Sequence, residues 1–148
     1  GVTQRLRYYF DASALVKRFK PEKSQETVRK IIHEASLGAH EIHSIYWAKA
    51  EFYVAMRRGN VPQKLAARSL RALGRIILFN PVTSEIVDDA LNLIYEFNLH
   101  AADAVHLATC TNLACEAILT DDEHMVEESV KRHLEKHAVK LINLKENP

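Results

Sequence analysis

The sequence has 148 residues, of which 47% are apolar and 26% are charged, and its formal net charge at pH 7 is +1. This length and composition predict a single globular domain over residues 1–148 and exclude a low-complexity or fibrous protein. No apolar run approaches the ~18 residues of a membrane span, and no signal-peptide pattern opens the chain, so we expect a cytoplasmic protein without a membrane partner.

Basic residues are concentrated in one part of the chain. Residues 52–84 contain six Lys or Arg and no Asp or Glu, whereas the remainder contains 14 basic and 19 acidic residues. Such an asymmetry indicates a polyanionic partner or, less specifically, a solvated face or a subunit contact.

Neither the cysteines nor the histidines indicate a zinc or redox site. Cys110 and Cys115 lie five residues apart in a predicted helix, which turns them roughly 140° from each other. We therefore expect two unpaired, buried apolar residues. No His-Glu-x-x-His or Cys/His ligand pattern accompanies the eight histidines.

The first predicted elements are a strand over residues 6–10 and a helix that follows Asp11. The strand is short and rich in aromatic residues, which is typical of a buried parallel strand. Apolar residues then recur at helical spacing from Ala12 to Phe19. Asp11 therefore lies at the carboxyl end of a strand, where open α/β sheets bind ligands. It could equally be only the N-cap of the helix.

The rest of the chain alternates between predicted helices and strands. The strand over 41–45 is the weakest prediction because Glu41 and His43 are polar, and residues 76–79 could be a strand or the end of a helix. Alternation of this kind predicts a three-layer α/β/α fold with a mainly parallel sheet of four or five strands. We expect further helices over 22–36 after Pro21, 46–58 up to Gly59, 62–75, from a cap at Thr83 or Ser84 to 97, 101–114, and from the turn at 121–122 to about 136, and further strands over 117–120 and 139–144.

The predicted helix over 62–75 is sharply amphipathic. Its apolar residues stack on one side, and a basic stripe repeats at intervals of four, three and four residues on the other. The stripe could contact nucleic acid, form a solvated face or lie at a dimer edge. Its members are Lys64, Arg68, Arg71 and Arg75.

Three further acids stand out in the sequence, and the first of them, Glu51, has no basic neighbour three or four residues away on its own helix. Glu51 and Asp103 lie on apolar faces of their predicted helices, and Asp122 follows the predicted strand over 117–120, with Asp121 as the alternative. A buried carboxylate needs a partner or must protonate. Separately, each has an ordinary explanation: a salt bridge for Glu51, the helix dipole for Asp103, and capping for Asp122.

Taken together, the four acids indicate a site for a hard divalent cation. Mg²⁺ and Mn²⁺ prefer oxygen ligands, and two such ions about 4 Å apart can activate a water for phosphodiester hydrolysis. We therefore expect one or two ions of Mg²⁺ or Mn²⁺ at these carboxylates.

Four stretches of the chain also resemble a known family. The segments YYFDASALVK, AKAEFYVAMRR, LHAADAVHLAT and AILTDDEH occur in the order and at the intervals of the PIN domain, especially of the small VapC-type toxin ribonucleases. The resemblance covers nearly the whole chain. It implies a metal-dependent endoribonuclease with a parallel sheet flanked by helices, commonly a homodimer, and a small antitoxin protein as a possible partner.

The resemblance also implies roles for individual residues. The catalytic and metal-binding acids would be Asp11, Glu51, Asp103 and Asp122. Ser13 and Thr120 would be supporting hydroxyls near the metal or phosphate, or else ordinary cap and turn donors. His106 is expected to pack against the site or contact a ligand. Lys17 and the basic stripe are the candidate contacts to RNA.

Two other functions fit parts of the pattern. A non-catalytic module in RNA metabolism could keep the fold and use its acids to hold an ion or a partner, although such a relative would more often have lost one acid. An aspartyl phosphotransfer protein could use Asp11 as the acceptor, but Ser13 stands where the D-x-D pattern of that class needs a second Asp.

Overall fold

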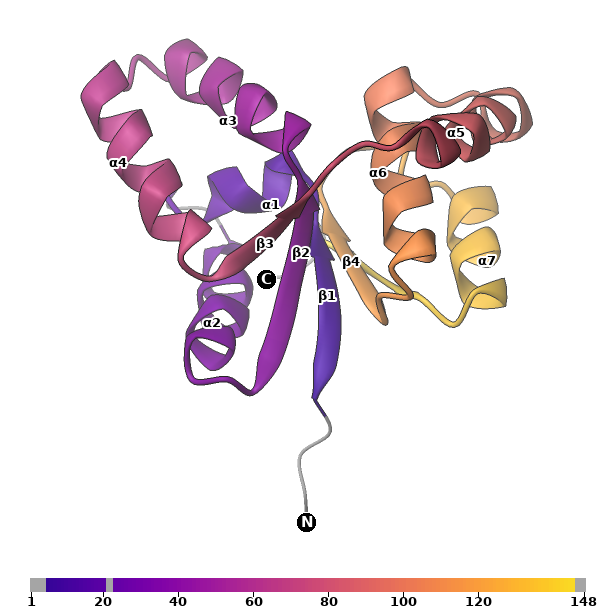
Figure 1. Ribbon diagram of the computed structural model, residues 1–148, viewed down its shortest axis with the longest axis horizontal. Helices are drawn as coiled ribbons and strands as arrows, with labels where there is room; N and C mark the ends of the chain where they lie inside the picture. The colour runs from indigo at the N-terminus through magenta and orange to yellow at the C-terminus, as the bar shows by residue number, and fades with distance from the viewer. Residues whose placement is uncertain (1–4, 21–22, 146–148) are drawn as a thin grey trace.

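The computed structural model describes residues 5–20 and 23–145, and in this part of the chain five parallel strands form one sheet (Figure 1). The strand order is β3-β2-β1-β4-β5, so the first strand is central and the chain builds outward from it in two directions. The strands are β1 (Leu6–Phe10), β2 (His40–Ile45), β3 (Ile77–Asn80), β4 (Ala117–Thr120) and β5 (Lys140–Asn143).

Helices cover both faces of the sheet, and each face has its own core. Phe10 points into the core on one side, together with residues of α1 to α4, and Tyr9 points into the core on the other side, with residues of α5 to α7 (Figure 1). The helices are α1 (Ala12–Lys17), α2 (Gln25–Ser36), α3 (Trp47–Arg58), α4 (Gln63–Gly74), α5 (Ser84–Phe97), α6 (Ala101–Asn112) and α7 (Glu128–Lys136).

The predicted α/β/α architecture with a parallel sheet is confirmed, and both open choices are resolved. Residues 77–80 form the edge strand β3 instead of a helix end. Thr83 caps α5, because its side chain accepts a hydrogen bond from the Ile86 amide at 3.2 Å. Cys110 and Cys115 are free and buried, as expected.

Two details of the prediction are wrong. Helix α2 begins at Gln25, since residues 23–24 form a turn, and the predicted start at Pro21 and Glu22 lies outside the described residues. Helix α7 begins only at Glu128, after a loop that follows β4. Gly59 is the C-cap of α3, as expected, and the left-handed residue that follows it is Asn60, whose φ is 58°.

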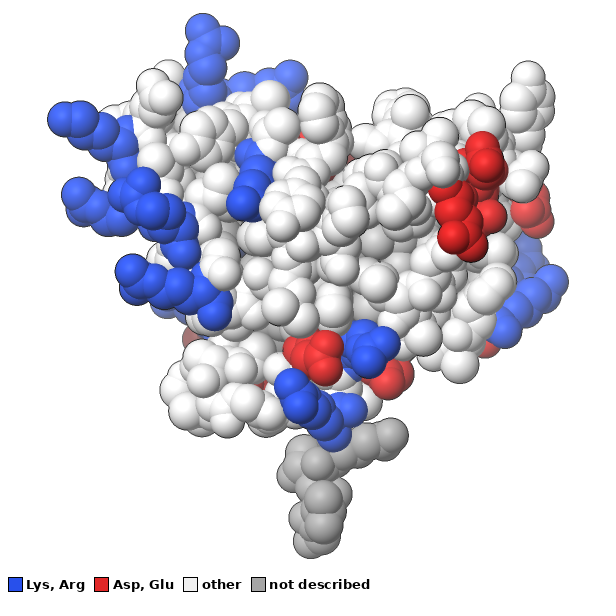
Figure 2. Space-filling model, in the orientation of Figure 1, with Lys and Arg blue, Asp and Glu red and all other residues white. Residues whose placement is uncertain are grey.

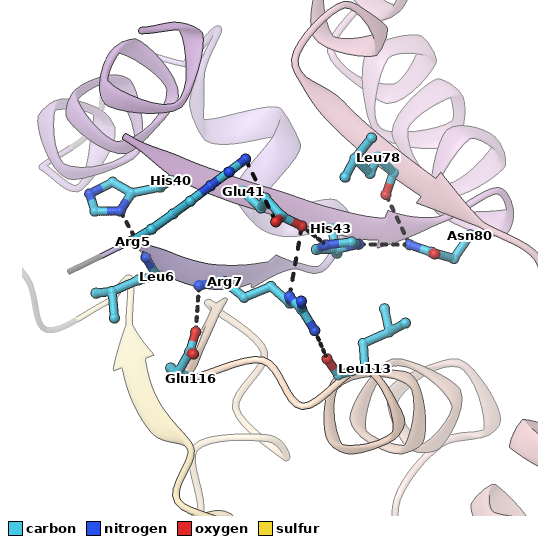
Figure 3. Close-up of polar contacts among 10 residues, drawn as sticks. All are labelled: Arg5, Leu6, Arg7, His40, Glu41, His43, Leu78, Asn80, Leu113 and Glu116. Atoms are coloured by element: carbon cyan, nitrogen blue, oxygen red, sulfur yellow. Dashed lines mark hydrogen bonds and ion pairs between the residues drawn. The ribbon is translucent and has the colours of Figure 1, made fainter. Parts of the chain in front are cut away.

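Strand β2 tolerates its polar residues because each has a partner (Figure 3). Asn80 Nδ2 donates to His43 Nδ1 at 3.2 Å, and His43 Nε2 lies 2.9 Å from Glu41 Oε1. Arg7 and Arg5 reach Glu41 at 3.7 Å each. The hydrogen bond with His43 has the largest effect on the pKa of Glu41 and lowers it below its usual value. The charges of Arg7 and Arg5 lower this pKa further. This network explains how a polar strand sits between β1 and β3.

Charge is segregated on the surface. Figure 2 shows Lys and Arg gathered over the side of α4 and Asp and Glu over α5, with a broad uncharged band between them. Exposed apolar side chains occur on β3, on α5 and at the start of α3. None of the helices in residues 5–20 and 23–145 is long and apolar enough to span a bilayer.

Candidate metal and phosphodiester site

Asp11 is held at the carboxyl edge of the sheet by hydrogen bonds to both carboxylate oxygens. Oδ1 accepts from the Ser13 hydroxyl and from the Ala14 amide at 3.2 Å, and Oδ2 accepts from the Thr120 hydroxyl. Asp11 is therefore the N-cap of α1, yet it is only 5% exposed and makes no ion pair within the described residues. Burial raises its pKa, although His106 and these hydrogen bonds oppose the shift.

Ser13 and Thr120 belong to one hydrogen-bonded loop around Asp11. Ser13 Oγ accepts from the Asp121 amide at 3.0 Å, and Thr120 Oγ1 accepts from the Asp122 amide at 3.1 Å. The two hydroxyls therefore tie the turn after β4 to the turn after β1. Both hydroxyls orient the carboxylate of Asp11 directly. These contacts favour a role in supporting the acid site over a role as local cap or turn donors alone.

Asp103 lies in the first turn of α6 and has a buried oxygen without a partner. Its Oδ2 has no hydrogen bond to any residue of the described chain, although Asp103 is only 9% exposed. Burial raises the pKa of Asp103 to about 6, and the negative charges of Asp122 and Asp11 add to the rise. A buried acid beside two other acids is costly unless a cation joins them.

Glu51 obtains its partner from the opposite face of the sheet. Its Oε1 lies 2.7 Å from Nε2 of His106, which is 2% exposed, and the other ring nitrogen of His106 lies 2.7 Å from the Tyr9 hydroxyl. A carboxylate only accepts, so Nε2 of His106 donates to Glu51. When the ring is neutral, the Tyr9 hydroxyl donates to Nδ1; when the ring is protonated, Nδ1 donates to the Tyr9 oxygen. Burial lowers the pKa of His106, but the Glu51 hydrogen bond and the charges of Asp11, Glu51 and Asp103 outweigh it and raise the pKa.

The two acids after β4 face different neighbours. Asp121 lies 3.3 Å from Lys17 Nζ, whereas Asp122 is the charge that most raises the pKa of Asp103. Asp122 Oδ1 also accepts from the His124 amide at 2.9 Å. This arrangement favours Asp122 over Asp121 as the fourth member of the acid cluster.

The residues predicted to contact RNA lie in two separate places in the structure. Lys17 is buried beside the acid cluster and paired with Asp121. All four basic stripe residues are exposed on α4 and just beyond it, and none of them lines the cavity beside Glu51 and Asp121. The members of the stripe are Lys64, Arg68, Arg71 and Arg75.

The described side chains do not form a finished ligand shell. Within residues 5–20 and 23–145, no group of three or more His, Cys, Asp or Glu side chains is already arranged around one point. The donor set nevertheless suits a hard cation, because it consists of carboxylates, one of which keeps a free buried oxygen.

Sequence reasoning gave His106 a general role and missed Tyr9. The sequence positions of both residues relate them to an acid. His106 follows Asp103 by three residues on one helix, and Tyr9 precedes Asp11 by two residues, near the end of the strand that leads to Asp11. The contact between Tyr9 and His106 could not be predicted from the sequence, because the two residues lie 97 positions apart.

Comparisons with known proteins identify the family and the fold of the chain. The model of the family described as the PIN domain matches residues 8–128. A toxin–antitoxin complex from Klebsiella pneumoniae is 16% identical, with a TM-score of 0.61, and the match covers 93% of this chain and 97% of that one. No curated protein sequence matches the chain.

Two further solved structures share the fold. VapC20 of Mycobacterium tuberculosis, described as a Sarcin-Ricin loop cleaving toxin, is 12% identical with a TM-score of 0.63, and the match covers 79% of this chain and 92% of that one. VapBC2 of Rickettsia felis, bound to a DNA fragment from its promoter, is 11% identical with a TM-score of 0.65, and the match covers 93% of this chain and 98% of that one.

Proposed function

The chain belongs to the PIN domain family, and from this premise we propose that it is a metal-dependent endoribonuclease, the toxin of a toxin–antitoxin pair. The observation that carries the proposal is the free buried oxygen of Asp103 beside Asp11 and Asp122. A bound cation would stabilise a cluster of acids that keeps an unpaired buried oxygen.

Four side chains would hold Mg²⁺ or Mn²⁺ in this proposal: Asp11, Glu51, Asp103 and Asp122. The ion supplies a Lewis acid that activates water and neutralises charge on the phosphate being cleaved. Ser13 and Thr120 fix the two oxygens of Asp11, and His106 fixes Glu51. Because these partners come from the sheet edge and from both helical layers, the fold itself orients Asp11 and Glu51 before a metal binds.

The proposed partners follow from the same premise. The Klebsiella structure is a toxin–antitoxin complex, which supports an antitoxin for this chain. A homodimer is supported by the exposed apolar side chains, which include Leu78 on β3 at 49% exposed and Leu91 on α5 at 55% exposed. Figure 2 shows the uncharged band that such a contact would bury.

The proposal is tested with a mixed RNA substrate in Mg²⁺, in Mn²⁺ and in EDTA, with Asp11→Asn beside the parent protein. We expect cuts with either metal, none in EDTA, and none from the variant, whose thermal unfolding should change little. Products should carry 5′-phosphate and 3′-hydroxyl ends, which end-specific ligation distinguishes. Cuts that persist in EDTA or in Asp11→Asn would contradict the assignment, and the absence of cuts in every lane would favour a non-catalytic binding module.

A further inference from the structure

A cavity of about 690 Å³ opens beside the acid cluster on the side of α1 to α3. Glu51, Ser13 and Asp121 line one part of it, so the cavity meets the proposed metal site directly. Its size lies in the range of ordinary ligand pockets. Its other lining includes five basic residues from several segments: Lys17, Lys20, Lys23, Arg58 and Lys145.

Four of the five basic residues are available to an anion. Lys17 is already paired with Asp121 at 3.3 Å. Across residues 5–20 and 23–145, no acid forms an ion pair with Lys20, Lys23, Arg58 or Lys145, and all four are exposed. Among the described residues, two acids line the cavity, Glu51 and Asp121. The described lining of the cavity therefore carries more basic than acidic side chains, and one of its acids, Glu51, is a proposed metal ligand.

The basic residues reach the cavity from separate places in the fold. Lys20 and Lys23 lie between α1 and α2, Arg58 is the last residue of α3, and Lys145 follows β5. A small anion would need these groups to converge on one point, whereas a chain of phosphates can meet them one after another. Apolar Val16, Val54 and Leu144 also line the cavity and offer contacts to sugars and bases.

We infer that this groove, and not the basic stripe on α4, binds the backbone of the single-stranded RNA that enters the acid cluster. The inference rests on the proposed ribonuclease function, because one of the acids that line the groove, Glu51, is a proposed metal ligand. Lys20, Lys23, Arg58 and Lys145 each meet a backbone phosphate, so the groove holds RNA without reading its sequence.

The test is binding of a fluorescent, mixed-sequence 20-nucleotide RNA in EDTA, measured by anisotropy over a range of salt concentrations. Three triple variants remove equal charge from exposed positions. The groove variant is K20Q/K23Q/R58Q, the stripe variant is K64Q/R68Q/R71Q, and the control on α7 is K131Q/R132Q/K136Q. Thermal unfolding of each variant confirms that the fold is intact.

The groove variant should lose about 100-fold in affinity at 0.1 M salt, and its salt slope should fall by about 2, since each phosphate contact to a single strand contributes about 0.7. The stripe and α7 variants should stay within about threefold of the parent. A stripe variant that loses as much as the groove variant, or a parent that does not bind RNA, would overturn the inference.

Two further measurements separate this inference from the proposed function and from another class of partner. If the parent fails to cleave RNA yet shows the same binding pattern, the groove stands and the nuclease proposal falls. If the parent cleaves RNA and the groove variant binds normally, the nuclease stands and the groove falls. A poly-glutamate peptide that binds as tightly as RNA and responds to the same variant would assign the groove to an acidic protein and overturn the inference.

Discussion

The Glu51–His106 pair and the Glu41–His43 pair share a geometry and differ in their surroundings. Their Nε2 to Oε1 distances are 2.7 and 2.9 Å. Arg5 and Arg7 accompany Glu41, whereas the acids Asp11 and Asp103 surround His106. Figure 3 shows the Glu41–His43 network, which joins Arg7 of β1 and Asn80 of β3 to the pair on β2. A histidine–carboxylate pair therefore does not mark a functional site by itself, and the sign of the neighbouring charge does.

The largest expected effect comes from removing the uncompensated charge at Asp103. The pKa of this acid is raised to about 6 from an ordinary value of 3.8. Between these values the folded state binds a proton that the unfolded state does not, so the free energy of unfolding falls as pH rises through this window. Without metal, Asp103→Asn should therefore melt higher than the parent at pH 7, and the difference should shrink near pH 4.

Mn²⁺ should reverse this order. An ion at 100 times its Kd adds about 2.7 kcal/mol to the free energy of unfolding, or about 5–10 °C for a chain of this size. We expect that gain in the parent and little of it in Asp103→Asn. The exposed Asp88→Asn removes the same charge and serves as the control, which should gain as the parent does. Equal gains in parent and Asp103→Asn would remove Asp103 from the proposed ligands.

The fold was predictable from the sequence because its signals are local. A change from strand to helical periodicity at Asp11 and the alternation of elements predicted a parallel sheet between helical layers, which the structure confirms. The polar strand β2 was the weakest prediction, since its stability depends on Arg7 and Asn80, which belong to neighbouring strands. Element boundaries failed where loops such as 121–127 carry helix-forming residues without helical packing.

The candidate site was only partly predictable. The lack of nearby cations on the helices of Glu51 and Asp103 is a pattern in the sequence, and so is the position of Asp11 at a strand end. No pattern in the sequence indicates the contact between Tyr9 and His106 or the basic groove, because both bring together segments that are far apart in the chain. The basic stripe on α4 was conspicuous by its spacing, whereas the groove residues have no spacing in common.

A smaller effect is expected from His106, because it acts through Glu51. Loss of a group that orients a metal ligand typically costs 10- to 100-fold in metal affinity or activity. His106→Ala should show this loss in Mn²⁺ affinity measured by calorimetry, and His106→Gln should lose less because its amide can still donate to Glu51. His43→Gln changes the matching histidine in the other pair and should bind Mn²⁺ as the parent does. Equal losses at His106 and His43 would show a general effect on folding instead.

The smallest effect is expected at Glu41, where every charge has a partner. The pKa of Glu41 is lowered from its ordinary value of 4.5, so its contribution to stability is present above that value and is lost as pH falls through the lowered pKa. Glu41→Gln should reduce the free energy of unfolding at pH 7 by about 0.2–1 kcal/mol, the usual range for exposed ion pairs, and by less at an acidic pH below the lowered pKa of Glu41. Denaturant unfolding at both pH values measures the difference, and RNA cleavage by the variant should equal that of the parent. This pH dependence is opposite in sign to that of Asp103. If Glu41→Gln instead stabilised the protein at pH 7, the two networks would share the same unfavourable charge, and the contrast that distinguishes the site would be lost.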